Sequence, residues 1–253
     1  MRVICKVRPR AWLAVACVLG FAAPIDAEGQ EPVFDDEERR AIEGVIEDYL
    51  LEHPEIVLRA LETLQQRQES QAAEQVQAAI QANRAALISD PNSPIAGNAD
   101  GDVTVVEFFD YRCPYCKRVV GDVEKLLETD DGVRLVYKEW PILGPESVFA
   151  ARAALAAREQ GQYLPFHQTI MGQREITEVS VMAAAEELGL DVERLRADMN
   201  APEVEAHLQV TMQLSQALGI TGTPAFVIGD ELVPGAVGLD QLRQLVAKAR
   251  DGG

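Results

Sequence analysis

Two cysteines stand where a predicted strand gives way to a predicted helix, and this arrangement restricts the fold more than any other feature of the sequence. Residues 103–109 are rich in β-branched and aromatic side chains, which is typical of a strand. Cys113 and Cys116 follow in a Cys-Pro-Tyr-Cys motif, and residues 119–127 then carry apolar side chains at helical spacing. A C-x-x-C motif at such a junction indicates redox chemistry rather than a structural cross-link.

The chain beyond residue 102 mixes short strands with helices. Further strands are predicted at residues 133–137, 225–228 and 231–233, helical patterns at about 145–219, and a last helix around 239–246. Gly229 and Asp230 between the last two strands are typical of a hairpin turn. Strands at both ends with helices between them predict an α/β domain at residues 89–253, with a helical insertion at about 145–219.

Residues 28–88 are predicted to form a helical arm that ends in a linker helix. His53-Pro54 divides the arm, because proline disfavours a helical conformation in the residue before it. From residue 65 to 81 the apolar stripe fades, so we expect little packing of that segment against a globular core. Residues 89–102 are turn-forming almost throughout, which places the domain boundary after residue 88.

The arm has an amphipathic face that short helices cannot bury by themselves. Its apolar members are Ile42, Val45, Ile46, Tyr49, Leu50, Val57, Leu61 and Leu64. This face could pack on the main domain of the same chain or against other copies. We favour self-association into a homo-oligomer, with a trimer as the favoured state, because the polar segment that follows would hold these helices away from the body.

The first residues are predicted to be an export signal. A basic start precedes an apolar run at residues 11–23, and a small residue, Ala27, marks the expected cleavage site. Removal of residues 1–27 takes four of the 23 basic and one of the 41 acidic residues, so the net charge changes from -18 to -21. We therefore expect a periplasmic protein that does not bind nucleic acid, since nucleic acid requires a basic face.

Cys113 and Cys116 are the two cysteines that remain after this removal. Cys113 is expected at a helix N-terminus, where backbone N–H groups and the helix dipole stabilise a thiolate, and Arg112 and Lys117 add positive charge beside it. Cys113 is thus the predicted nucleophile and Cys116 the resolving thiol. A zinc half-site lacks two further ligands, and a structural disulfide across so small a loop would stabilise little. Cu(I) capture by two thiolates is a further alternative, but redox exchange is favoured over all three, and no bound metal is expected.

Several segments together resemble the DsbA-like branch of the thioredoxin superfamily. They are Glu-Phe-Phe-Asp-Tyr-Arg-Cys-Pro-Tyr-Cys-Lys at residues 107–117, Val-Tyr-Lys-Glu-Trp-Pro at 136–141 and Gly-Thr-Pro-Ala-Phe at 222–226. Residues 46–56 are similar to the N-terminal region of ScsC proteins, named for suppression of copper sensitivity. The resemblance implies a thioredoxin fold with an inserted helical domain, preceded by an α-helical arm.

The resemblance also implies roles for individual residues. Pro114 and Tyr115 would belong to the active-site loop, and Pro224, preceded by Thr223, would form the cis-proline loop that faces it. Glu107 matches a buried acid that moves protons to and from the resolving cysteine. Its alternative is an outward-facing strand residue, since the alternation of side chains leaves its direction open. No cofactor is expected beyond the redox-active cysteine pair.

Two departures from strong DsbA oxidases bear on the direction of exchange. The chain has Pro-Tyr between the cysteines where those oxidases carry a histidine, so a cation that stabilises the thiolate is missing. We expect a redox potential of about -200 to -130 mV, less oxidising than a strong oxidase. Thr223 stands where those oxidases usually carry valine and resembles the isomerases, and its hydroxyl can hydrogen-bond toward a cysteine sulfur.

We therefore expect a thiol–disulfide interchange enzyme of the ScsC type that reshuffles or reduces disulfides. Its substrates would be unfolded or misoxidised exported proteins, and a membrane redox partner would keep Cys113 reduced. One alternative is a monomeric DsbA-like dithiol oxidase. Another is a Cu(I)-sequestering protein, although the dispersed methionines favour core packing over a metal tract.

Overall fold

The computed structural model describes residues 34–252, which divide into two compact units at Leu61 and Glu62. The predicted export signal at residues 1–27 lies outside the described part of the chain. Among residues 34–252, every helix is too short or too polar to cross a membrane.

The arm consists of helices whose ends follow from local sequence signals. They are α1 (Asp36–Glu52), α2 (Glu55–Ala82) and α3 (Arg84–Ile88). Asp35 caps α1, because its Oδ1 accepts hydrogen bonds from the backbone N–H groups of Glu37 at 2.8 Å and Glu38 at 2.9 Å. His53 ends the helix by donating its N–H to the carbonyl of Tyr49 at 2.9 Å. The predicted break at His53-Pro54 is confirmed.

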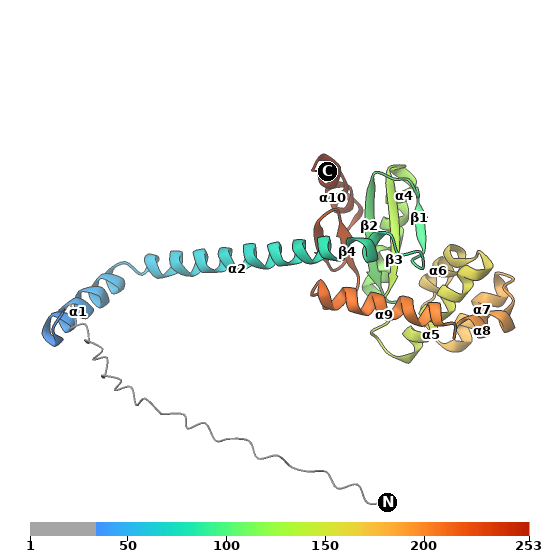
Figure 1. Ribbon diagram of the computed structural model, residues 1–253, viewed down its shortest axis with the longest axis horizontal. Coiled ribbons are helices and arrows are strands. Elements are labelled where there is room, and N and C mark those ends of the chain that lie inside the picture. The colour runs from blue at the N-terminus through green and yellow to red at the C-terminus, as the bar shows by residue number, and fades with distance from the viewer. Residues whose placement is uncertain (1–33, 253) are drawn as a thin grey trace, which may run out of the picture. The chain divides into compact units, whose positions relative to one another are not determined.

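The second unit is built on a mixed five-stranded sheet with the order β1-β3-β2-β4-β5 (Figure 1). The strands are β1 (Ile95–Gly97), β2 (Val103–Phe109), β3 (Val133–Glu139), β4 (Ala225–Ile228) and β5 (Glu231–Pro234). The pair β2–β3 is parallel, whereas the other neighbours are antiparallel. The central strand β2 is therefore hydrogen-bonded on both sides, and it is the strand that leads to the cysteines.

Helices cover both faces of this sheet and give it two cores. On one face lie α4 (Pro114–Thr129) and α10 (Leu239–Asp251), and on the other lie α3 and α9 (Pro202–Ala217). The remaining helices gather beside the sheet in Figure 1: α5 (Pro145–Ala157), the 3-10 turn Arg158–Gln160, α6 (Tyr163–Gly172), α7 (Glu178–Glu187) and α8 (Val192–Asp198). Val105 and Phe109 of β2 enter the core that contains α4, while Val106 and Phe108 enter the other. The predicted helical insertion between strands is confirmed.

The predicted boundary after residue 88 is wrong. Ile80 of α2 and Leu87 of α3 are each 1% exposed and belong to the core on the α9 face. The end of α2 is thus part of the catalytic unit, and the boundary lies near residue 61. Val76 and Ala79 on the same side of α2 also pack against this core. The turn-rich segment after residue 88 also contributes a strand, β1, which pairs with β3.

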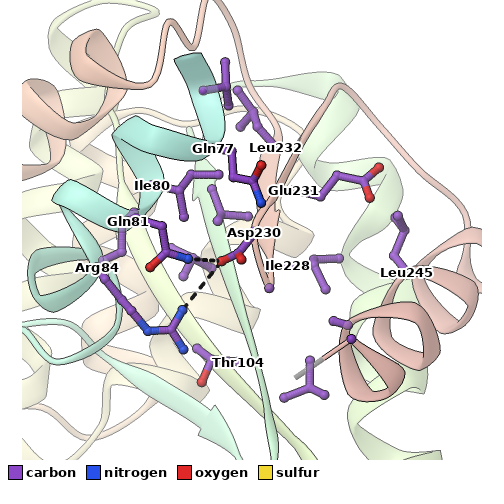
Figure 2. A pocket seen from close by; sticks show the side chains of 18 of the residues that line it. Gln77, Ile80, Gln81, Arg84, Thr104, Ile228, Asp230, Glu231, Leu232 and Leu245 are labelled. Atoms are coloured by element: carbon purple, nitrogen blue, oxygen red, sulfur yellow. Dashed lines mark hydrogen bonds and ion pairs between the residues drawn. The ribbon is translucent and has the colours of Figure 1, made fainter. Parts of the chain in front are cut away.

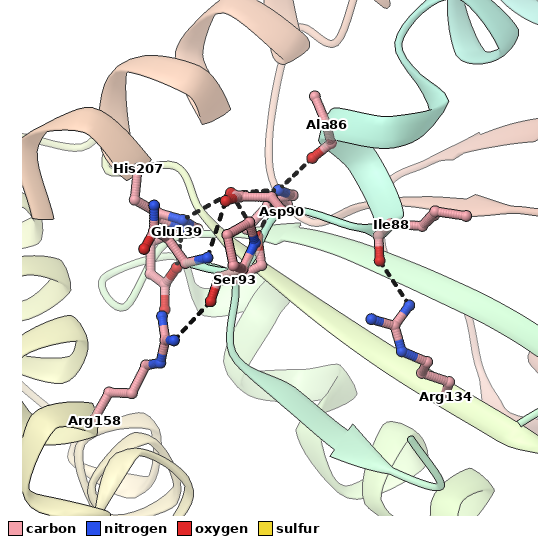
Figure 3. Close-up of polar contacts among 11 residues, drawn as sticks. Ala86, Ile88, Asp90, Ser93, Arg134, Glu139, Arg158 and His207 are labelled. Carbon is pink, nitrogen blue, oxygen red and sulfur yellow. Dashed lines mark hydrogen bonds and ion pairs between the residues drawn. The ribbon is translucent and has the colours of Figure 1, made fainter. Parts of the chain in front are cut away.

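A buried lysine holds the segment between α3 and β1 against the sheet. Figure 3 shows its partners Ala86, Asp90 and Ser93. Lys138 of β3 has a fully buried side chain whose Nζ donates to the carbonyl of Ala86 at 2.7 Å and to Ser93 Oγ at 2.6 Å. The same Nζ lies 3.3 Å from Asp90 Oδ2. Burial lowers the pKa of Lys138, whereas the ion pair with Asp90 opposes that change. The segment is therefore fixed by partners far away in the sequence.

Replacing Leu87 by alanine tests whether the end of the arm belongs to the catalytic core. Leu87→Ala should lower the free energy of unfolding by about 2 to 4 kcal/mol, because it leaves a cavity beside the sheet. Met212→Ala on α9, where the side chain is 48% exposed, should change it by less than about 0.5 kcal/mol. Denaturant unfolding measures both values, and similar small losses for the two variants would contradict the revised boundary.

Candidate active site

The cysteine pair lies at the junction of β2 and α4, where the sequence predicted it. Cys113 occupies the N-cap of α4, and Pro114 takes the first helical position, which suits its fixed backbone angle. The turn is closed by backbone hydrogen bonds from Cys113 N to the Asp110 carbonyl at 3.0 Å and from Lys117 N to the Cys113 carbonyl at 3.1 Å. Unpaired N–H groups at the helix start are thereby gathered around the Cys113 backbone.

The cis-proline loop packs directly against the first cysteine. The Thr223–Pro224 peptide bond is cis, and Cys113 Sγ donates a hydrogen bond to the Thr223 carbonyl at 3.1 Å. Both cysteines are free thiols, and Cys113 is only 4% exposed. The geometry therefore brings Cys113 and the loop together as the resemblance implies, with the contact made by the backbone of Thr223.

Cys116 is more deeply buried than Cys113. Its side chain is fully buried one turn inside α4, and this burial raises the pKa of the Cys116 thiol well above its ordinary value. The nearby Glu107 carboxyl raises it further, whereas hydrogen bonds with the Asp110 backbone and the Thr223 side chain work in the opposite direction. Cys116 thus needs a base close by before it can act as a nucleophile.

Glu107 is a buried carboxyl group whose charge acts on Cys116. It is 3% exposed and follows Val105 on the face of β2 that α4 covers, so the outward-facing alternative does not hold. Burial raises the pKa of Glu107 to about 8. A carboxyl group with a pKa near neutrality can both accept and return a proton at physiological pH.

The two cations beside the motif are already engaged with other groups. Lys117 Nζ donates to backbone carbonyls at the end of α6, including that of Gln173 at 2.7 Å. Arg112 Nη1 donates to the Leu143 carbonyl at 2.6 Å and to Glu146 Oε2 at 2.9 Å. The positive charge that the sequence predicts beside Cys113 is therefore shared with the helical insertion.

The surface around the motif carries exposed apolar and aromatic side chains. Tyr115 is 54% exposed, and the guanidinium of Arg118 lies 5.1 Å from the centre of its ring, within range of a cation–π contact. Ile142 and Leu143, in the loop that Arg112 binds, are each 42% exposed.

A buried aromatic cluster beneath the active site could not be foreseen from the sequence. His167 of α6 lies 3.0 Å from the Tyr111 hydroxyl through its Nδ1 and is surrounded by the rings of Phe109, Tyr137 and Tyr163. Burial lowers the pKa of His167 to about 4, so the ring is neutral at physiological pH. The sequence gives no signal for this cluster, since the partners of His167 are distant along the chain.

A second buried histidine joins the insertion to β3. His207 of α9 lies 2.8 Å from Glu139 through its Nε2 and 3.5 Å from Asp90 through its Nδ1 (Figure 3). Burial alone would lower the pKa of His207, but the two carboxylates raise it overall. In the described residues, no group of three or more His, Cys, Asp or Glu side chains could hold a metal ion.

A groove of the second unit is separate from the cysteines. It is lined by the end of α2, the β4–β5 hairpin and α10, and Figure 2 shows Ile80, Gln81 and Asp230 among its residues. Thr104 at the start of β2 also lines it, whereas Cys113 follows the other end of that strand. This groove is therefore not part of the thiol site.

The pKa of Glu107 gives a test of its burial through stability. A folded-state pKa of about 8 against an ordinary 4.5 means that deprotonation favours unfolding, so stability present below pH 4.5 is lost as the pH rises through 8. Between pH 4.5 and 8, the free energy of unfolding of the wild type should fall by up to roughly 5 kcal/mol relative to that of Glu107→Gln. Urea unfolding at several pH values measures it, with exposed Glu128→Gln as a control that keeps the wild-type profile. Parallel curves for the wild type and Glu107→Gln would contradict the assignment.

Comparison with known families supports this geometry. Residues 104–247 match the DSBA-like thioredoxin domain, and residues 38–71 match the copper resistance protein ScsC N-terminal domain. The chain spans about a quarter of curated relatives such as the Na(+)/H(+) antiporter NhaA 3 of Salinispora tropica, which is 29% identical over 61% of this chain and 24% of that protein.

Solved structures extend the match to both parts of the chain. A thioredoxin-like oxidoreductase from Silicibacter pomeroyi DSS-3 is 55% identical, with a TM-score of 0.67 over 68% of this chain and 99% of that chain. A linker-deletion variant of Proteus mirabilis ScsC is 28% identical, with a TM-score of 0.67 over 88% of this chain and 100% of that chain. The chain thus belongs to the DsbA-like thioredoxin family of thiol–disulfide oxidoreductases and, within it, to the ScsC type.

Proposed function

We propose that this protein is a periplasmic disulfide isomerase and reductase that acts on exported proteins as a homo-oligomer. The observation that carries the proposal is the uncovered apolar face of the arm on a chain that also bears a reactive thiol pair. The export signal predicted at residues 1–27 and a periplasmic thioredoxin-like relative from Salmonella enterica support the location. A membrane reductase is the expected partner, because isomerisation needs Cys113 reduced.

The chemistry follows from the difference between the two thiols. The Cys113 thiolate attacks a substrate disulfide, which breaks the S–S bond, forms a mixed disulfide and releases one substrate thiolate. That thiolate can attack another disulfide of the same substrate. A substrate thiolate finally attacks the mixed disulfide, which forms a new substrate disulfide and releases Cys113 with no net oxidation. Alternatively, Cys116 gives its proton to Glu107 and attacks the mixed disulfide, which reduces the substrate and oxidises the pair. The raised pKa of Cys116 slows this second route and favours isomerisation.

The arm supports assembly because its apolar side chains lack burial. No residue of α1 is buried, and Val45, Ile46 and Tyr49 are 69%, 52% and 53% exposed. Val57, Leu61 and Leu64 of α2 are 44%, 57% and 52% exposed. A second copy of the same helices offers a matching apolar face. Several Cys113 thiols in one particle would raise the local concentration of thiol around a substrate with many disulfides.

Refolding of scrambled ribonuclease tests the isomerase activity. The reduced protein should restore ribonuclease activity, and Cys113→Ser should abolish this effect. Cys116→Ser should retain a substantial part of it, because isomerisation needs one nucleophile, and should accumulate mixed disulfides. No recovery with reduced wild-type protein rejects the isomerase. Faster oxidation of reduced peptides by a monomer would favour the oxidase alternative, and Cu(I) binding that outcompetes a strong chelator would favour copper sequestration.

Light scattering tests the arm as the assembly surface. The chain without residues 1–27 should have the mass of an oligomer, with a trimer favoured, and Ile46→Glu should convert it to a monomer because a charge is placed in the apolar face. Glu47→Gln, on the polar side of the same helix, should leave the mass unchanged. A monomeric wild type with intact helices by circular dichroism would contradict the proposal.

A further inference from the structure

Asp110 is a buried acid immediately after β2 that the exchange chemistry does not use. It is 1% exposed, and its carboxylate accepts four hydrogen bonds. Oδ1 accepts from Arg112 N at 2.7 Å and Ser147 Oγ at 2.8 Å, and Oδ2 accepts from Ile142 N at 2.8 Å and Leu143 N at 3.0 Å. The donors come from the turn before Cys113, the loop after β3 and the first turn of α5.

These partners require both oxygens to act as acceptors. Backbone N–H groups can only donate, so neither oxygen can be replaced by a donor without leaving an N–H group unpaired. A buried carboxylate without partners would be costly, and here the four donors offset that cost. Asp110 thus joins the catalytic turn to the start of the helical insertion.

Two further hydrogen bonds hold the turn at residues 110–113 and the loop at residues 142–143, and neither involves the Asp110 carboxylate. The backbone carbonyl of Asp110 accepts the Cys113 N–H at 3.0 Å, and the Arg112 guanidinium donates to the Leu143 carbonyl at 2.6 Å. Gly144 has a φ of 116°, and a Cβ there would lie 3.0 Å from Arg112 Nη1. The positive φ at position 144 therefore favours glycine in the loop that meets Arg112.

We propose that Asp110 is a positioning residue for thiol–disulfide exchange, whose carboxylate fixes the Arg112–Cys113 turn so that the N–H groups at the start of α4 stabilise the Cys113 thiolate. It acts through the backbone of Arg112 and through the 142–143 loop. The inference rests on Cys113 as the nucleophile, but not on isomerase activity.

Asp110→Asn separates positioning from charge, because the two effects have opposite signs. Loss of a negative charge near Cys113 by itself favours the thiolate and would lower the pH midpoint of its reactivity. The asparagine amide keeps the shape, but its NH₂ group must face either Arg112 N–H or the N–H groups of Ile142 and Leu143. If the Arg112–Cys113 turn is no longer held, the N–H groups stabilise the Cys113 thiolate less, and the pH midpoint of its reactivity rises.

The experiment measures the rate of Cys113 alkylation by iodoacetamide against pH, in residues 28–253 carrying Cys116→Ser. Asp110→Asn should raise the midpoint by about one pH unit, so that the rate at low pH falls about tenfold. Iodoacetamide reacts with any accessible thiolate, so the measurement remains valid if the refolding assay fails.

Two further variants keep the test decisive. Ser147→Ala removes one donor from Asp110 and should raise the midpoint by a smaller amount, which decides the matter if Asp110→Asn does not fold. Glu146→Gln removes a charge from the first turn of α5 without removing any of the four donors, and it should not raise the midpoint. An unchanged or lowered midpoint in folded Asp110→Asn, an unchanged one in Ser147→Ala, or an equal rise in Glu146→Gln would overturn the proposal.

Discussion

Strand β2 is hydrogen-bonded to β3 on one side and to β4 on the other, and helices cover both of its faces. Val105 and Phe109 therefore enter one core and Val106 and Phe108 the other. Glu107 is buried on the face beneath α4, where burial raises its pKa to about 8. The chain must leave the sheet at Phe109 and begin α4 at Pro114, so Cys113 falls on the helix N-cap. Glu107, Cys113 and Cys116, to which the proposed mechanism assigns the proton acceptor, the nucleophile and the resolving thiol, are thus all positioned by β2 and the turn that follows it.

Two buried charged residues at the end of β3 attach the linker and the helical insertion to the sheet. Lys138 binds the segment between α3 and β1, while Glu139 hydrogen-bonds to Tyr163 and His207 of the helical insertion. Asp90 completes the group and lies near both Lys138 and His207. Buried charges of this kind contribute little net stability, but they disfavour other arrangements in which one of them would lose its partner. They therefore specify how the insertion and the linker attach to the sheet.

The sequence predicts those features that depend on local periodicity and fails for those that depend on distant partners. The strands, the insertion and the break at His53 follow from spacing and from proline. The direction of Glu107 stays open because its neighbours Val106 and Phe108 are apolar, and a strand buried on both faces loses the alternating signal. Asp110 reaches Ser147, 37 positions away, and Lys138 reaches Asp90, 48 positions away, so neither cluster has a sequence signature.

The arm differs from the sheet because its first helix has no buried residue. Helix α1 has a complete capping box and acidic residues in its first turn, which stabilise its N-terminus, yet none of its residues is buried. Isolated helices of this length are marginal in water, so the burial of an apolar face has to supply the missing stability. Acidic side chains on the other side of the helix repel those of a second copy, and salt screens that repulsion. Association of the proposed kind would therefore depend on apolar contact rather than on charge, and physiological ionic strength favours it.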